Sequence, residues 1–332
     1  MRVPTTMMRS DLIVSPSPHV HSGSSIASIY HNILLALLPA TLVGFSVYGV
    51  SAIQVVCASV ASAMLAEALF QLMLRRPVTV ADGSAAVSGL LLGLILPAGT
   101  PLYVVVVANF LGIIVGKQFF GGLGANPLNP VLVGWAAVRI TKTWAGFLDF
   151  DLMLINHDTG FSMAYPLAVL KAKGAVALQD VQLIDLLLGK QSGGIGASAI
   201  IWLFLGGFYL LVRGMVPWEI PLGFFVGMIL TGGIFWVASP TSYASPVFHI
   251  LTGNAVIGAF FLLTDTGSSP TNRWAMLLYG FIGGAITIVL RAWSTYPDGV
   301  VFAGLLASLF APLLDKLRKR QEVPPSRPLK FL

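Results

Sequence analysis

The feature that most constrains this fold is a series of ten apolar runs, each bounded by glycine, proline or charged residues. Most runs approach the roughly 20 residues that an α-helix needs to cross about 30 Å of hydrocarbon. The composition agrees, because 56% of the residues are hydrophobic and 10% are charged, against about 25% charged residues in a soluble domain. We therefore predict an all-α integral membrane protein with about ten transmembrane helices, at 33–50, 53–74, 85–96, 102–120, 128–140, 195–212, 220–237, 247–263, 274–290 and 300–314.

The two halves of the chain show a weak internal repeat. Segment 89–140 aligns with segment 258–310 at an offset of 169 to 170 residues, which matches two prolines and one glycine. Ten helices divide into five and five, and a repeat with an odd number of helices inserts in the opposite orientation. We predict two inverted five-helix repeats, 31–141 and 195–315, with short or broken helices at the centre. Chance similarity in a chain with 35 glycines and 20 prolines is the alternative.

The polar segments predict the topology. Residues 1–30 do not combine a charged start with the short apolar core and cleavage site of a signal peptide, so we expect a cytoplasmic N-terminal segment. Ten crossings then make the basic tail 316–332 cytoplasmic and the long loop 142–194 periplasmic. This arrangement places thirteen of the 19 Lys and Arg residues in the cytoplasm, as the positive-inside rule requires in a bacterial inner membrane.

Charge and cysteine content exclude several functions. The net charge of +6 is explained by the cytoplasmic loops and the tail, so we expect no nucleic-acid partner. Cys57 is the only cysteine, and one thiolate cannot hold an iron–sulfur cluster. The spacing of His19, His21 and His31 matches no metal site. An electron carrier on this chain would therefore be organic.

Three Gly- and Pro-containing polar segments interrupt the apolar runs, at 81–89, 124–130 and 262–272. In inverted-repeat membrane proteins, short or interrupted helices bring polar groups into the membrane and form the binding site. In the predicted topology all three segments lie on the cytoplasmic side, where they can converge on one pocket. Helix capping and turn formation are the simpler explanation of each residue alone. The candidate residues are Asp82, Gly83, Ser84, Asn126, Asn129, Asp265, Ser268 and Ser269.

Glu67 is the only carboxylate well inside an apolar run. A buried acid in lipid is costly unless it is paired or functional. Two interpretations are open: Glu67 belongs to an ion or proton route, or its side chain extends toward the polar end of the helix near Arg75.

Four segments carry a family resemblance: "DGSAAVSGLLLGLILPAGTP", "GANPLNPVLVGW", "LLTDTGSSPTNRWAMLLYGFIGGAITIVLR" and "YPDGVVFAGLLASLFAPLLD". Together they resemble the D subunit of the Rnf ion-translocating ferredoxin:NAD oxidoreductase complex, which is related to the B subunit of the sodium-pumping NADH:quinone reductase. The resemblance covers roughly 30–317. It implies a membrane electron-transfer subunit with a non-covalent riboflavin among the helices and an FMN on the outer loop, in a complex with iron–sulfur and flavin subunits.

The resemblance also implies that FMN is linked to a threonine in an S/T-x-A-T-P-L motif. The motif falls on Ser162, Met163, Ala164, Tyr165 and Pro166, and Tyr165 stands in place of the threonine. A phenol differs from an aliphatic hydroxyl in size and acidity, so we do not expect the usual covalent bond. The alternatives are FMN stacked without a bond on the Tyr165 ring, a bond shifted to a neighbouring hydroxyl, or loss of this flavin.

The preferred interpretation is an electron-transfer subunit in which charge on a buried flavin is balanced by Na⁺ or H⁺. The candidate residues of the three polar segments would then form the riboflavin pocket or the ion route. No substrate catalysis is expected from this chain alone. The alternatives are a channel or transporter for a small solute, since "NPLNP" resembles the Asn-Pro turns of water channels, and a purely structural membrane anchor.

Overall fold

The computed structural model describes residues 25–140, 165–178, 181–189 and 191–316. These residues form helices and turns, and no β-strand occurs among them. The first half contains α1 (Ile26–Met73), α2 (Ser84–Ile95), α3 (Leu102–Gly116) and α4 (Pro130–Ile140), with short 3₁₀ turns at Val80–Asp82 and Gln118–Phe120. The second half contains α9 (Ile200–Val212), α10 (Glu219–Ala238), α11 (Pro246–Ile250), α12 (Ala255–Ile257), α13 (Arg273–Trp293) and α14 (Val300–Lys316).

All ten apolar runs lie in helical segments, with two differences from the prediction. The first two runs are the two arms of α1, which bends at Gly49, where φ is 66°. The run 247–263 is not one helix: α11, a turn at Gly253 with φ of 65°, α12 and a π-helical turn at Gly258–Leu262 follow one another. This broken element belongs to the centre of the fold.

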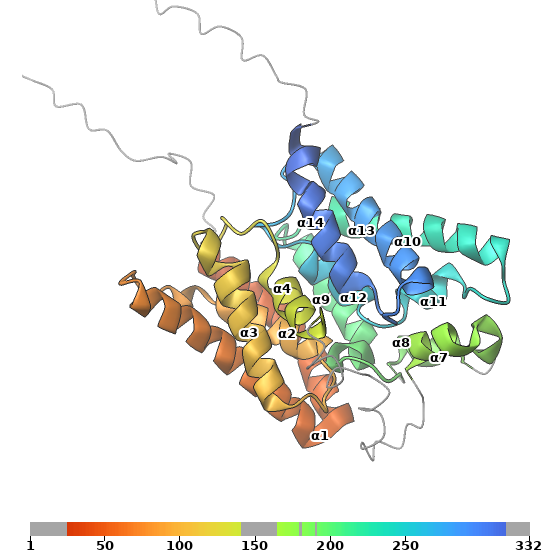
Figure 1. Cartoon of the computed structure of the whole chain (residues 1–332), viewed down its shortest axis with the longest axis horizontal. Helices are drawn as coiled ribbons and strands as arrows, with labels where there is room; N and C mark the ends of the chain where they lie inside the picture. The colour runs from red at the N-terminus through yellow and green to blue at the C-terminus, as the bar shows by residue number, and fades with distance from the viewer. Residues whose placement is uncertain (1–24, 141–164, 179–180, 190, 317–332) are drawn as a thin grey trace, which may run out of the picture.

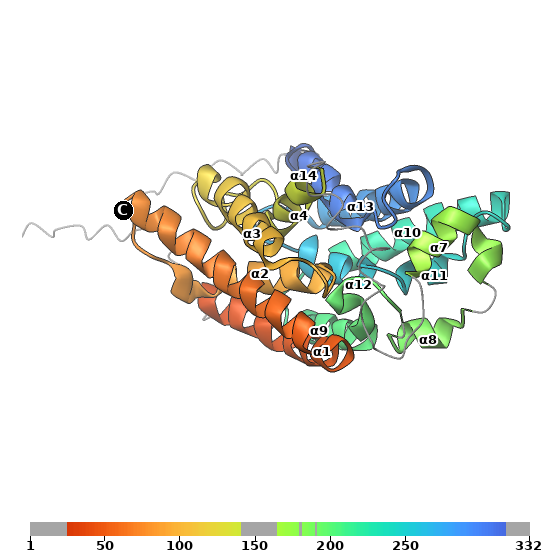
Figure 2. The same ribbon diagram turned by 60° about the horizontal axis from the view of Figure 1, so that its bottom comes forward.

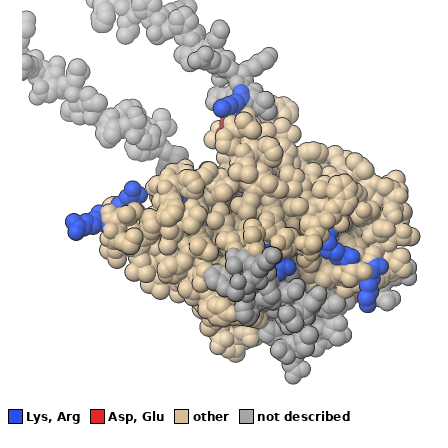
Figure 3. Space-filling model, in the orientation of Figure 1, with Lys and Arg blue, Asp and Glu red and all other residues tan. Residues whose placement is uncertain are grey.

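Four helical segments are long and apolar enough to cross a membrane: Ile26–Met73, Ile195–Val212, Glu219–Ala238 and Arg273–Trp293. The segments Ser84–Ile95, Leu102–Gln118 and Pro130–Ile140 are apolar but shorter. In Figure 3 most of the visible surface carries no charged side chain, as expected for a surface covered by lipid. The chain is therefore a helical, multi-pass membrane protein.

The helices of the two halves are arranged side by side (Figures 1 and 2). In Figure 2, α1 to α4 occupy one side, α10 and α13 the other, and α9 and α12 lie between them. The connection between the halves contains α7 (Pro166–Lys173), a 3₁₀ turn at Ala175–Leu178 and α8 (Leu183–Leu187). In Figure 1, α7 and α8 lie at the end of the molecule away from the end of α14.

Small residues allow the backbones of neighbouring helices to touch. Gly223 and Gly227 of α10 face Gly280 and Gly284 of α13, and a Cβ atom added at Gly284 would lie 2.0 Å from the Phe224 carbonyl oxygen. Close pairs of glycines spaced four apart are a common means of helix packing in lipid, where the hydrophobic effect between helices is weak. These glycines explain why α10 and α13 form an extended contact.

Side chains cap the starts of α4 and α14. Asn129 precedes α4, and its Oδ1 accepts a hydrogen bond from the Val131 backbone N–H at 2.8 Å. Asp298 precedes α14, and its Oδ1 accepts from the Val300 N–H at 3.3 Å. Such caps satisfy N–H groups at the start of a helix that would otherwise stay unpaired in the membrane.

Candidate functional site

A cavity of about 210 Å³ lies where the two halves meet. It is enclosed by α1, α2, the segment after α3, the start of α4, the end of α9 and the π-helical turn. Its walls are mainly apolar, and most of its polar groups come from the three segments that the sequence singled out. The apolar lining includes Ile29, Ile33, Val87, Leu91, Phe260 and Phe261, and the polar lining includes Ser84, Lys117, Asn126, Asn129, Thr264 and Asp265.

Asn126 and Asp265 join the halves across the cavity. The Asn126 Nδ2 donates to Asp265 Oδ2 at 3.0 Å, and the Ser268 hydroxyl donates to the same oxygen at 3.1 Å. Gly267 is required at this point, because a Cβ atom there would lie 2.1 Å from Asn126 Oδ1. Ser269 contributes its backbone N–H to the Asp265 carbonyl. The turn 265–269 is therefore built around one aspartate.

Asn129 makes a second link between the halves. Its Nδ2 donates to the Leu262 carbonyl of the π-helical turn at 2.8 Å, while its Oδ1 caps α4. The capping explanation of Asn129 is thus true, and the residue also lines the cavity.

A buried ion pair lies at the edge of the cavity. Glu67, 1% exposed, accepts a hydrogen bond from Lys117 Nζ at 2.6 Å, and Lys117 is 2% exposed. The same oxygen, Oε1, accepts from Gln118 Nε2 at 2.8 Å and lies 3.4 Å from Gln71 Nε2. The other oxygen, Oε2, is buried without a hydrogen-bond partner among the described residues. Glu67 is therefore a fully buried acid that is paired within the protein.

Ser84 and Asp82 continue this network toward the start of α2. Lys117 Nζ also donates to Ser84 Oγ at 2.6 Å, and Ser84 Oγ donates to Asp82 Oδ1 at 2.6 Å. Gly83 permits the turn with φ of 81°. Glu67, Lys117, Ser84 and Asp82 therefore form a continuous polar chain, of which Lys117 and Ser84 line the cavity.

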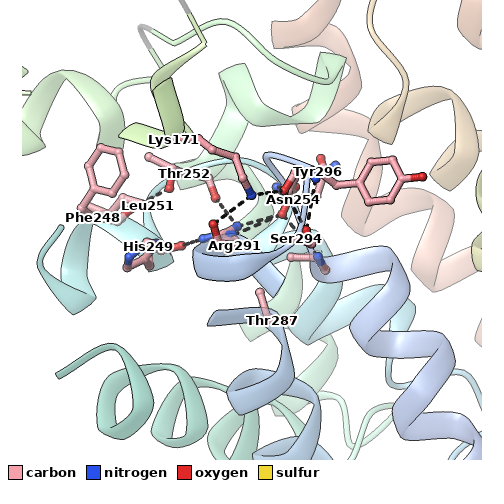
Figure 4. Close-up of polar contacts among 12 residues, drawn as sticks. Lys171, Phe248, His249, Leu251, Thr252, Asn254, Thr287, Arg291, Ser294 and Tyr296 are labelled. Carbon is pink, nitrogen blue, oxygen red and sulfur yellow. Dashed lines mark hydrogen bonds and ion pairs between the residues drawn. The ribbon is translucent and has the colours of Figure 1, made fainter. Parts of the chain in front are cut away.

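The role of Lys117 is not predicted from the sequence, where this residue has the position of a cytoplasmic loop charge. One feature of the sequence could have indicated this role. Lys117 lies at the end of an apolar run, 50 residues after Glu67, which is the only acid well inside such a run. The second half contains a similar pair: Arg291, 5% exposed, contacts Asp298, 4% exposed, at 3.0 Å. Figure 4 shows Arg291 also donating to the carbonyl groups of His249 and Thr252. A buried charge is tolerated when it is paired and hydrogen-bonded in this way.

Tyr165 lies far from this cavity, at the start of α7. Its side chain is 1% exposed and packs in a cluster with Leu167, Leu186, Ala244 and Phe248. A Cβ atom added at Gly193 would lie 3.1 Å from the Tyr165 ring. Pro166 is the first residue of α7, and Ser162, Met163 and Ala164 lie outside the described residues.

Comparison with known proteins assigns the family. Residues 13–323 match the model of the NQR2, RnfD, RnfE family. The chain is 35% identical to the D subunit of the Na(+)-translocating ferredoxin:NAD(+) oxidoreductase complex of Acetobacterium woodii, over 95% of this chain and 96% of the relative. It is 33% identical to the D subunit of the proton-translocating ferredoxin:NAD(+) oxidoreductase complex of Clostridium ljungdahlii, over 96% and 95%. It is 32% identical to the D subunit of the ion-translocating oxidoreductase complex of Escherichia coli, over 91% and 95%. The chain therefore belongs to the NQR2, RnfD, RnfE family.

Proposed function

We propose that this chain is the membrane electron-transfer subunit of an Rnf-type ferredoxin:NAD oxidoreductase and couples electron flow to Na⁺ or H⁺ translocation. The names of its relatives at 32% to 35% identity support this role. The observation that carries the proposal is the cavity between the halves, because it combines apolar walls with a buried ion pair.

The lining of this cavity fits a riboflavin. Phe260, Phe261 and Leu91 offer apolar surfaces for a planar ring. Asn126, Asp265 and Ser84 offer donors and acceptors for its polar edge and hydroxyl chain. When bound, a flavin accepts and passes on electrons.

Charged residues of the chain would balance the negative charge that electrons bring into the cavity. The Lys117 ammonium lines the cavity and is balanced by Glu67, so protonation of Glu67 would leave a positive charge that favours negative charge in this low-dielectric site. The unpartnered Oε2 of Glu67 is an available position for a proton or a Na⁺ ion. Ser84 and Asp82 extend this position toward the start of α2 and form the proposed ion route.

For FMN, we propose that no covalent bond is made to this chain. Tyr165 replaces the expected threonine, and its ring is enclosed by protein. The Tyr165 side chain is 1% exposed, so the residues described here do not fit an FMN stacked on this ring.

We propose the partners and the membrane location of the chain from its family. The chain would join other membrane and peripheral subunits that carry iron–sulfur clusters and flavins, in a bacterial inner membrane. The inverted five-helix repeats are supported by one further correspondence: Asn129 with Val131 and Asp298 with Val300 make the same cap at an offset of 169 residues.

Gly267→Ala tests the riboflavin site. The new methyl group would displace Asn126 from Asp265, and we expect the purified complex to lose non-covalent riboflavin while the flavins of other subunits stay bound. Gly233→Ala is the matched control, since its Cβ atom would meet only Pro246 at 3.9 Å. Flavins are released by denaturation and identified by chromatography. Equal riboflavin in both variants and the wild type would exclude this cavity, and solute flux through a flavin-free protein would favour the channel alternative.

A further inference from the structure

A second cavity, of about 340 Å³, lies away from the first, between α7, α10, α11 and α13. Its lining combines the hydroxyl groups of Thr241, Ser242 and Tyr243 with the basic side chains of Lys171, Lys173 and Arg291. No acidic residue lines it among the residues that the structure describes.

The positive charges of this cavity are not equally compensated. Arg291 is neutralised by Asp298. Lys171 Nζ donates to the backbone carbonyls of Arg291 and Tyr296 at 3.1 and 2.9 Å (Figure 4), which leaves its charge without a carboxylate partner among the described residues. Lys173 is exposed and forms no ion pair with a described residue. Figure 3 shows basic side chains near the position of α7 and no acidic side chain beside them in that view.

His249 supplies a further polar group. Its side chain is 5% exposed, it lines the cavity, and its Nδ1 has no hydrogen-bond partner among the described residues. Buried polar atoms are nearly always paired, so an unpaired one beside a cavity is available to a group bound there. Together with two uncompensated lysines, it makes the cavity suitable for an anion with several oxygen acceptors, such as a phosphate group.

Aromatic residues place this cavity at the level of the lipid headgroups. Phe235 packs against Tyr243 and Trp293, with ring centroids 5.1 and 5.4 Å apart. Trp236 and Trp293, near the ends of α10 and α13, are 44% and 70% exposed. Exposed tryptophans at helix ends are typical of the membrane–water interface. The phosphate most available at this depth belongs to a phospholipid.

We propose that this cavity binds the headgroup phosphate of an anionic phospholipid. The basic lining repels the ammonium group of a zwitterionic lipid and leaves a net attraction for an anionic one. The hydroxyl groups of Thr241 and Ser242 and the imidazole of His249 lie around the proposed phosphate position.

Native mass spectrometry of the purified complex after mild delipidation tests this inference. The complex is incubated with phosphatidylglycerol, with phosphatidylcholine, or with phosphatidylglycerol and inorganic phosphate. We expect selective retention of phosphatidylglycerol, about fivefold weaker in Lys173→Gln, which is the weakening expected for one lysine near a membrane surface. Lys173→Arg should restore it. Lys173 is exposed, so neither variant threatens folding.

Lys316→Gln is the control, because it removes the same charge from an exposed position at the end of α14. Retention that falls equally in Lys173→Gln and Lys316→Gln would show a general charge effect and overturn the site. Unchanged retention in Lys173→Gln would show that this lysine only offsets the carbonyl groups at the end of α7 and would also overturn it. Competition by inorganic phosphate, with no preference for phosphatidylglycerol, would exclude a lipid as the ligand.

Discussion

At the scale of single residues, the buried Glu67–Lys117 pair dominates the candidate site. Lys117→Met leaves the Glu67 carboxylate uncompensated in a buried position. We expect destabilisation of about 3–5 kcal/mol and loss of ion translocation. The double variant Glu67→Gln/Lys117→Met should recover most of the stability, because no buried charge is then left unpaired. It should not recover the translocation, because both charged groups of the proposed route are gone.

Thermal unfolding of the complex and ion uptake into vesicles measure the two effects. Lys316→Gln is the control, since Lys316 is exposed and forms no ion pair with a described residue, and a charge at such a position contributes less than about 1 kcal/mol. A stable, active Lys117→Met variant would contradict the role of the pair.

A second residue-scale prediction concerns Tyr165. Burial raises the pKa of the Tyr165 phenol well above its ordinary value, so the folded protein holds this proton more tightly than the unfolded chain does. The resulting stability is present below pH about 10 and is lost as the pH rises past it. The Tyr165→Phe variant has no phenol to ionise, so it does not lose stability in this way as the pH rises. The difference in unfolding free energy between wild type and variant should shrink from pH about 9 to about 11, and a constant difference would contradict the burial.

At the scale of helices, glycine contacts decide how α10 and α13 pack. Gly284→Ala places a methyl group 2.0 Å from the Phe224 carbonyl, so the helices must separate. We expect a loss of about 1–3 kcal/mol, measured as a lower unfolding midpoint in detergent. Gly233→Ala on α10 faces open packing and should be neutral or slightly stabilising, because alanine favours a helix. Equal midpoints for the two variants would contradict the close backbone contact.

At the scale of the whole molecule, the predicted topology can be measured with single cysteines. Cys57 is the only cysteine, so Cys57→Ser provides a background without reactive thiols. In that background we expect Gln182→Cys, on the connection between the halves, to react with a membrane-impermeant maleimide in intact cells. Arg76→Cys, after α1, should react only after the membrane is opened. Both positions are exposed, and labelling of both from the same side would exclude the assigned orientation.

Much of the fold could be predicted because apolar length and Gly/Pro interruptions are local signals. The ten runs predicted the helical segments, and the polar segments 81–89, 124–130 and 262–272 contain the residues that meet around the first cavity. Lipid requires a continuous helix to be apolar, and a polar interruption must therefore find a partner within the protein. The convergence of Asn126 with Asp265 was predictable on that ground.

The tertiary structure alone decided which charges pair. Lys117 meets Glu67 and Arg291 meets Asp298 because packing removes both side chains from water, whereas in the sequence each basic residue stands at the end of an apolar run, as a solvated loop charge would. The enclosure of Tyr165 depends on Gly193, Ala244 and Phe248, which are distant in the chain. The sequence by itself determined the membrane class and the polar segments, since these follow from local hydrophobicity. Burial, pairing and the two cavities depend on contacts between distant segments, which no local pattern records.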